Sequence, residues 1–377
     1  MGKRAPNGMG TIRERKDGRW EGRYTAPDGR QRSVYAVGKK EVIDKLKKAT
    51  ALMTLGTWFE PSKITTEAWL RMWLKDYATN IKPTTRENYT KYMENHVIPA
   101  IGKIKLSRLG AVHVQRMFGE MARNGKSAGT QSAVRIALSS AMSAAVKFKL
   151  IQENPCKGVK IGKTEEKEMV IVDRPDMPLF VLAAKQSQYY AAMMVLLQTG
   201  IRTGELRGLR WRDVDLDAKQ ITICQQISDI KAGPIIQSTK GYSKRRIIII
   251  DETVKILRAH KKAQAETRLK NGWKDNDLTR DLVFRMQDGS AYPRTVLNWA
   301  VKKAGRMAGI EGLHPHSLRD SYAIAAMRSG VDVKTVQNNL GHKDATMTLN
   351  TYAKYTDDAG EVAALKFAEY WANNAQV

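Results

Sequence analysis

Cysteine is nearly absent from this chain: Cys156 and Cys224 are the only two among 377 residues. They lie far apart in the sequence and outside any Cys-x-x-Cys or Cys/His cluster. This spacing argues against a disulfide framework and against a zinc site. It predicts two buried free thiols, as expected for a protein of the reducing cytoplasm.

Long apolar runs are also missing. No stretch approaches the roughly 20 apolar residues that a helix needs to span a bilayer. The N-terminal segment Met1-Gly2-Lys3-Arg4 is not followed by the apolar core of a secretory signal peptide. Hydrophobic residues nevertheless make up 42% of the chain, which argues against wholesale disorder. We therefore expect a folded cytoplasmic protein of two or three domains with no membrane partner.

Acidic residues are scarce compared with basic ones. The chain has 64 Lys and Arg against 38 Asp and Glu, which gives a net charge of +26. The first 160 residues hold +18 of this charge. Such an excess favours a polyanionic partner, and nucleic acid is the first candidate.

The N-terminal residues 1–60 are predicted to form a small sheet and one helix. Residues 11–37 read as short alternating segments separated by Asp17-Gly18 and Asp28-Gly29, and Asp-Gly is a strong hairpin signal. Residues 39–55 have the spacing of an amphipathic helix. Arginines alternate along the strands, so this three-stranded sheet would enter a DNA groove or lie on phosphates. A solvated sheet face is the alternative.

Residues 61–160 are predicted to form a separate all-α domain. Apolar side chains recur there at helical spacing throughout. The polar, charged segment 163–168 that follows has the composition of a linker. Four helices are expected before it, at 65–79, 83–98, 111–123 and 128–149.

Residues 161–377 are predicted to form a third domain of the α+β class, mainly helical with a small antiparallel sheet. Its most β-prone run is 245–250, which ends in four consecutive isoleucines. Strands are expected near 220–227, 233–238 and 245–250. Helices are expected at 175–186, 188–198, 251–270, 294–308, 317–329, 332–340 and near 357–372.

This last domain carries four short motifs in a fixed order. They are the run 199–206 (TGIRTGEL), His316-Ser317-Leu318-Arg319, Leu340-Gly341-His342, and Tyr352. Arginine offers a fork of donors that matches two phosphate oxygens, imidazole moves protons near neutral pH, and a phenol can attack phosphorus. The set as a whole suits chemistry on a phosphodiester.

Together and in this order, the motifs resemble those of the tyrosine recombinase or phage integrase family, whose catalytic domains show TGLRxGEL, HxLRH, LGH and a late tyrosine. The resemblance covers about 160–377 by motif. The layout before it is similar to the family's DNA-binding domains, with 1–60 as an arm-type and 61–160 as a core-site DNA-binding domain. One departure is visible, because the family usually has histidine where this chain has Asp320.

The resemblance implies a role for each matching residue. Tyr352 would attack the scissile phosphorus and form a 3′-phosphotyrosyl bond. Arg202 and Arg319 would stabilise the non-bridging oxygens, and Glu205 would support Arg202.

Three further residues would handle protons and hydrogen bonds. His316 would help to move the tyrosine proton, Lys240 would protonate the leaving 5′-oxygen, and His342 would hydrogen-bond a phosphate oxygen. No metal, cofactor or ATP is implied.

Several assignments have alternatives in the sequence. Tyr355 competes with Tyr352 as the nucleophile. Lys244, Arg245 and Arg246 compete with Lys240 in the predicted hairpin. His314 stays unassigned.

Each motif residue also has a structural reading. Arg202 would pair with Glu205 at a helix start, and His342 would cap a helix. His316 and Arg319 would form a capping pair with Asp320.

The resemblance also implies partners. Four protomers would assemble on double-stranded DNA with core-type and arm-type sites, and a Holliday junction would form as a phage or conjugative mobile element is integrated or excised. An accessory DNA-bending or directionality factor is compatible with this scheme. The helix near 357–372 would pack on a neighbouring protomer or on its own chain. The alternatives are a type IB topoisomerase-like strand relaxer and a basic DNA-binding protein that never cuts.

Overall fold

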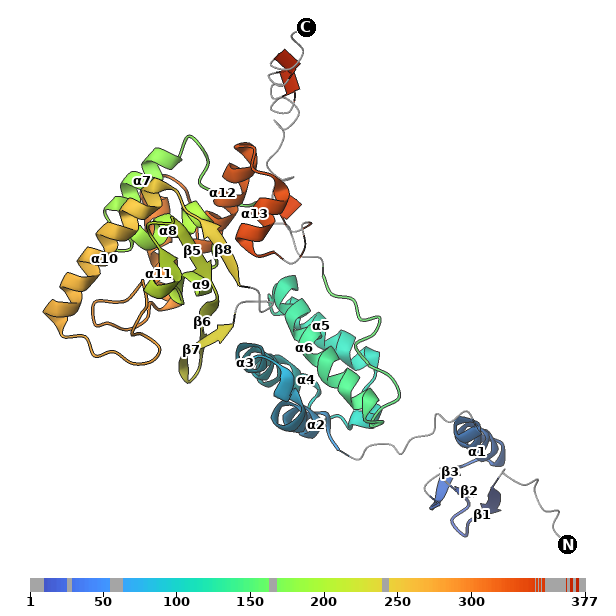
Figure 1. Cartoon of the computed structure of the whole chain (residues 1–377). Helices are drawn as coiled ribbons and strands as arrows, with labels where there is room; N and C mark the ends of the chain where they lie inside the picture. Colours follow the sequence, from blue (N-terminus) through green and yellow to red (C-terminus); the bar gives the residue numbers. More distant parts are fainter. Residues whose placement is uncertain are drawn as a thin grey trace. The chain divides into compact units, whose positions relative to one another are not determined.

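The computed structural model describes residues 10–25, 29–54, 64–162, 168–238 and 244–342, and beyond these only 344, 346, 348, 349, 364, 367, 368, 371 and 372. The chain divides into two compact units, Met1–Glu165 and Glu166–Val377. Figure 1 labels the helices and strands of both. Most of the helix expected near 357–372 lies outside the described residues, and the five residues of it that are described, 364, 367, 368, 371 and 372, are helical. None of the described helices is long and apolar enough to cross a membrane.

The first unit begins with the expected three-stranded antiparallel sheet and helix (Figure 1). Helix α1 packs against strands β2 and β3. A side chain on Gly22 of β2 would approach Val34, Val42 and Leu46 within 3.1–3.5 Å, so glycine lets the helix lie close to the sheet. The elements are β1 (Thr11–Glu14), β2 (Trp20–Thr25), β3 (Gln31–Ala36) and α1 (Lys39–Thr54).

The rest of this unit is all helical, as expected, and has a core of its own. The Trp69 indole lies in that core and donates a hydrogen bond to the carbonyl of Ala141 at 3.0 Å. The two helices expected at 65–79 and 83–98 each change to wider π-helical turns. The elements are α2 (Thr66–Met72), the π-turns Trp73–Tyr77 and Met93–Val97, α3 (Pro83–Tyr92), α4 (Ile98–Ile101), α5 (Ala111–Arg123), α6 (Ala128–Lys147), and the 3₁₀ turns Ala78–Asn80 and Leu106–Arg108.

The strands of the second unit form two small antiparallel sheets. The strand expected at 220–227 is in fact two strands that belong to different sheets, with Cys224 between them. Arg210 donates a hydrogen bond to the Cys224 sulfur at 3.1 Å, at the point where the chain changes sheet. One sheet contains β4 (Val214–Asp215), β5 (Gln220–Ile223) and β8 (Arg245–Ile248), and the other contains β6 (Gln225–Ile230) and β7 (Gly233–Ser238).

Helix α8 lies at the centre of this second unit, and α7, α10, α11 and α12 contact it (Figure 1). Eight of its ten residues are buried, which is typical of a helix surrounded by others on all sides. The helices are α7 (Met177–Lys185), α8 (Tyr190–Thr199), α9 (Thr203–Arg207), α10 (Asp251–Asn271), α11 (Arg294–Met307), α12 (Pro315–Arg328) and α13 (Val333–Leu340), with a 3₁₀ turn at Trp211–Asp213.

The two cysteines differ in burial. Cys156 is buried as predicted, and desolvation raises the pKa of its thiol to about 12. Cys224 is only partly buried, so the prediction of a buried thiol is wrong at this position. Desolvation, followed by the nearby Asp213 charge, raises the pKa of this thiol as well. Both thiols therefore stay protonated at neutral pH, which makes them poor nucleophiles.

Gly200 ends α8 in the left-handed conformation, with φ of +64°. A Cβ atom there would lie 2.4 Å from Cδ1 of Tyr322 and 2.7 Å from Cδ2 of Leu340. We predict that Gly200→Ala lowers the thermal midpoint of the second unit through left-handed strain of about 1–2 kcal/mol and overpacking of about 1–3 kcal/mol.

Gly272→Ala is the matched control for this change. Gly272 also ends a helix in the left-handed conformation, with φ of +56°, but its added Cβ would meet nothing within 4 Å. Gly272→Ala should therefore lower the thermal midpoint only by the strain of the left-handed conformation, without the overpacking. Equal losses of thermal stability in the two variants would contradict the packing at Gly200.

Candidate active site

Two of the sequence motifs are the ends of helices. Helix α8 ends at Gly200 and α13 ends at Gly341, and both glycines are left-handed, with φ of +64° and +66°. Arg202 lies two residues beyond the first glycine, and His342 directly follows the second. The TGxR and LGH motifs thus share one local design, in which a glycine stops a helix and presents a polar side chain.

Arg319 of α12 connects these two helix ends. Its Nη1 donates to the carbonyl of Gly200 at 2.5 Å, and its Nη2 donates to the carbonyl of Leu340 at 2.7 Å. Carbonyls at helix C-termini lack intrahelical partners and carry partial negative charge, so a guanidinium suits them. The side chain is buried, and desolvation, followed by the charge of Arg202, lowers the pKa of Arg319 to about 9. It still carries a positive charge at neutral pH.

Arg202 lies beside Arg319 and reaches the same turn. Its Nη2 donates to the carbonyl of Gly341 at 2.9 Å, and its Nη1 donates to Glu205 at 3.0 Å. Its backbone N–H also donates to the carboxylate of Glu205, the third residue of α9, and this hydrogen bond caps the start of that helix. The expected pairing of Arg202 with Glu205 at a helix start is therefore present. The Arg202 side chain also reaches Gly341, the residue before His342. A quarter of the Arg202 side chain is exposed.

Glu205 is completely buried and is shared by two arginines. Besides Arg202, it accepts two hydrogen bonds from Arg245, at 3.0 and 2.6 Å. Desolvation raises the pKa of Glu205, but the hydrogen bonds and charge of Arg245, together with those of Arg202, outweigh this and leave the pKa below its usual value. The carboxylate is therefore ionised. Arg245 is held by this carboxylate, which argues against Arg245 as an alternative to Lys240 for protonating the leaving oxygen.

The buried charges do not balance. Arg202, Arg245 and Arg319 bring three guanidinium groups to one place, where the ionised carboxylate of Glu205 pairs with Arg202 and Arg245. Burial weakens the screening of this charge by water. The cluster therefore has the electrostatics of an anion-binding site.

His316 lies on the exposed side of the first turn of α12, three residues before Arg319. Its side chain is 69% exposed, and its Nε2 lies 3.9 Å from the Asp320 carboxylate. Desolvation raises the pKa of Asp320. This long contact does not cap the helix. His314 does so instead, because its Nδ1 accepts from the backbone N–H of Ser317 at 3.0 Å, which gives the unassigned histidine a structural role.

His342 is held at the end of α13 by its own backbone and side chain. Its backbone N–H donates to the carbonyl of Gln337, which completes the helix cap, and its Nδ1 lies 2.9 Å from the Thr348 hydroxyl. Desolvation, followed by the charges of Arg319 and Arg202, lowers the pKa of His342 to about 4. The imidazole is thus neutral at physiological pH and can donate or accept one hydrogen bond at each nitrogen.

The structure brings together four of the seven predicted residues, Arg202, Glu205, Arg319 and His342, and places His316 on the same helix as Arg319. Lys240 and Tyr352 lie outside the described residues, and so does Tyr355. Their roles stay predictions.

Sequence reasoning did not assign Arg245 to this cluster. Side chains alternate between the two faces of a strand, so Arg245 lies on the same face as the buried Ile247 and Ile249. This alternation could have predicted that Arg245 points toward the interior.

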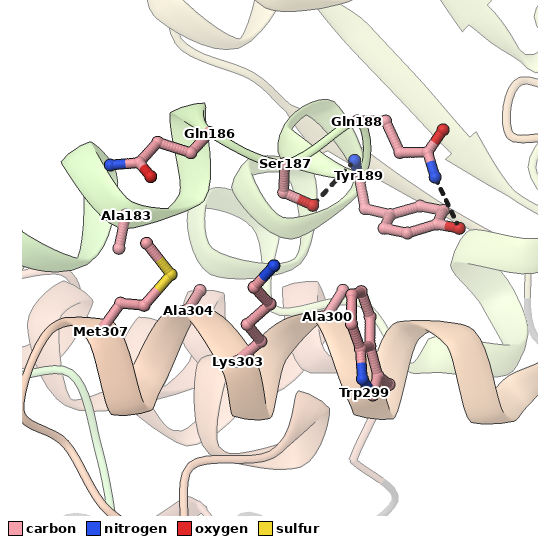
Figure 2. A pocket seen from close by; sticks show the side chains of 10 residues that line it. All are labelled: Ala183, Gln186, Ser187, Gln188, Tyr189, Trp299, Ala300, Lys303, Ala304 and Met307. Atoms are coloured by element: carbon pink, nitrogen blue, oxygen red, sulfur yellow. Dashed lines mark hydrogen bonds between the residues drawn. The ribbon is translucent and has the colours of Figure 1, made fainter.

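Within the described ranges, no group of three or more His, Cys, Asp or Glu side chains could hold a metal ion. Figure 2 shows a pocket of about 340 Å³ between the ends of α7 and α8 and the side of α11, lined by residues that include Tyr189, Trp299 and Lys303. None of the predicted site residues lines it.

The sheet of the first unit exposes a basic face opposite α1, here termed the open sheet face: Arg13, Glu21, Arg23, Ser33 and Tyr35. Glu21 lies at its centre with 2% exposure and accepts hydrogen bonds from the four other side chains. The hydrogen bonds from Arg23, Arg13 and Ser33 lower the pKa of Glu21 to about 2. The face is therefore an ordered array of donors.

These features define a class of protein: a multidomain, mainly helical chain with a buried, positively charged cluster suited to a phosphate group. The family model for the phage integrase family matches residues 165–358, and the model for the N-terminal SAM-like domain of phage integrases matches residues 65–121. The chain belongs to the phage integrase family, the tyrosine recombinases.

Individual relatives agree with this assignment. The chain is 27% identical over 342 residues to a XerC-like tyrosine recombinase of Caldanaerobacter subterraneus, which covers 85% of this chain and 87% of the relative. It is 24% identical over 361 residues to the integrase of Mycobacterium phage L5, with 92% and 93% covered.

Solved structures show the same fold. The Tn1549 transposon integrase in complex with a circular intermediate DNA aligns with a TM-score of 0.67 at 21% identity, covering 81% of this chain and all of that chain. A lambda integrase tetramer bound to a Holliday junction aligns with a TM-score of 0.58 at 18% identity, covering 92% and 96%.

The depressed pKa of His342 predicts a dependence of stability on pH. In the unfolded chain the imidazole has its ordinary pKa of 6.5, whereas in the folded chain its pKa is about 4. The unfolded state therefore gains protons first, and stability falls as the pH drops through this window. His342→Gln should reduce this loss, measured as the shift of the urea midpoint between about pH 7 and about pH 5. An identical shift in both proteins would contradict the assignment.

Proposed function

We propose that this chain is a site-specific DNA recombinase that integrates and excises a mobile element by cleaving and rejoining DNA through a 3′-phosphotyrosyl intermediate. The observation that carries the proposal is the convergence of Arg202, Arg319 and His342 on the two glycine-capped helix ends. Family membership supports it independently.

In the proposed reaction the Tyr352 oxygen attacks the scissile phosphorus. A bond forms between that oxygen and phosphorus, the bond from phosphorus to the 5′-oxygen breaks, and the 5′-hydroxyl leaves. Lys240 supplies the proton to the leaving oxygen, and His316 helps to accept the proton of the tyrosine. The phosphodiester bond energy is kept in the phosphotyrosyl bond, so the proposed reaction requires no ATP. The arginine side chains would stabilise the developing phosphate charge in place of a metal ion.

The positive cluster stabilises the charge that develops on phosphorus. Arg202 and Arg319 bind the non-bridging oxygens, and their positions are fixed before the substrate arrives by carbonyls at helix ends. The neutral His342 adds a hydrogen bond without adding charge. Glu205 is the supporting residue that holds Arg202.

DNA recognition is assigned to the residues before the catalytic domain 161–377. The open sheet face would bind arm-type sites through residues 1–60, and the helical residues 61–160 would bind core-type sites. Four protomers would assemble on two DNA sites and pass through a Holliday junction, in line with the lambda integrase tetramer. An accessory DNA-bending or directionality factor would act on this assembly.

We predict that Tyr352→Phe abolishes covalent capture of a nicked suicide DNA substrate, since phenylalanine lacks the attacking oxygen. The protein should still bind that DNA. Denaturing gels report the covalent complex, and mobility shifts report binding. Tyr355→Phe is the matched control and should retain capture. A normal covalent yield from Tyr352→Phe would refute the assignment of the nucleophile.

The open sheet face gives a second prediction. Replacing Arg13 and Arg23 together by Gln should weaken binding to an arm-type DNA site. It should also reduce the slope of log affinity against log salt concentration by about 2, because two phosphate contacts are lost. Lys40→Gln on α1, away from that face, is the control. An unchanged salt slope in the double variant would exclude the open sheet face as the phosphate-binding surface.

A further inference from the structure

Arg245 makes more contacts to the active-site framework than the family motifs explain. It opens strand β8, and only 9% of its side chain is exposed. Its Nη1 and Nη2 donate to the two oxygens of Glu205, and its Nε donates to the carbonyl of Asn339 at 2.7 Å. Three of its five N–H donors are thereby occupied, which leaves Arg245 poorly placed to bind substrate itself.

The hydrogen-bonding capacity of Glu205 is filled by these contacts. A carboxylate offers about four lone-pair positions on its two oxygens. Arg245 takes one on each oxygen, the Arg202 backbone N–H takes another, and Arg202 Nη1 takes the last. Arg202 is thus held to Glu205 by one side-chain hydrogen bond, while its other terminal nitrogen donates to Gly341.

Arg245 also lies beneath the turn that presents His342. A Cβ atom on Gly341 would lie 3.0 Å from Nη1 and 3.1 Å from Cζ of Arg245. Glycine at this position therefore permits the left-handed turn and also the close approach of the guanidinium. The same side chain connects strand β8, Glu205 and the end of α13.

We infer that Arg245 is a positioning residue for the phosphate-binding arginine. It saturates Glu205, so that this carboxylate holds Arg202 by one side-chain contact instead of drawing it into a bidentate ion pair, and Arg202 keeps donors for a phosphate. Without Arg245, the freed oxygens of Glu205 compete with the substrate for Arg202. This inference rests on the recombinase function proposed above and adds a residue to it.

The test uses Arg245→Met in the full chain and two suicide substrates. One has an ordinary scissile phosphate, and the other has a methylphosphonate, in which a methyl group replaces one non-bridging oxygen and removes the negative charge. Single-turnover rates of covalent complex formation are measured on both. Arg258→Met is the control, since Arg258 is an exposed arginine paired with Asp217 at 2.7 Å.

The inference predicts that Arg245→Met slows cleavage of the phosphate substrate about 100-fold, the loss typical of one misplaced electrostatic donor. Cleavage of the methylphosphonate should change only a few-fold, because a neutral substrate depends less on the arginine charges. Arg245→Lys should resemble Arg245→Met, since one ammonium group cannot span both Glu205 oxygens and the Asn339 carbonyl. Arg258→Met should match the parent on both substrates.

A double variant tests the route through Glu205. If the freed carboxylate traps Arg202, Glu205→Gln added to Arg245→Met should not slow phosphate cleavage further and should partly restore it. Additive losses would overturn the inference. So would equal losses on both substrates, which mark a purely structural role, or an absence of loss. A parent chain that forms no covalent complex would instead refute the recombinase function itself.

Discussion

The fork of hydrogen bonds from Arg319 to the carbonyls of Gly200 and Leu340 is the contact on which the active site depends. It fixes the end of α8 against the end of α13, although 140 residues separate these two carbonyls along the chain. Both ends close with a left-handed glycine, and each glycine is followed by a motif residue, Arg202 or His342. One buried guanidinium therefore sets the distance between residues that the sequence places far apart.

This arrangement also determines the electrostatics. Arg319 donates to two backbone carbonyls and forms no ion pair with a carboxylate among the described residues. Glu205 is shared between Arg202 and Arg245, which leaves the cluster with an excess of positive charge. Desolvation, followed by the charges of Arg319 and Arg202, lowers the pKa of His342 to about 4 and keeps its imidazole neutral. A phosphodiester is the type of ligand that this imbalance favours.

Local patterns in the sequence predicted most of the fold. The Asp17-Gly18 and Asp28-Gly29 turns predicted the N-terminal sheet, and helical periodicity predicted α5 at its observed bounds. Features set by distant contacts were not predictable in this way. The break at Cys224 depends on Arg210 and on two separate sheets, and the role of Arg245 depends on Glu205, 40 residues earlier. The motifs predicted Arg202, Arg319 and His342 as site residues. The backbone carbonyls that hold the two arginines could not be predicted, because every residue has one and no residue type marks them.

The residue of this protein that becomes covalently linked to DNA can be identified directly. After capture on a suicide substrate, trypsin would cut after Lys343, Lys354 and Lys366, which places Tyr352 and Tyr355 in different peptides. Mass spectrometry of the DNA-linked peptide should find the segment 344–354 joined to a 3′-phosphate. Linkage to the segment 355–366, or to a 5′-phosphate, would show that Tyr352 does not form a 3′-phosphotyrosyl bond.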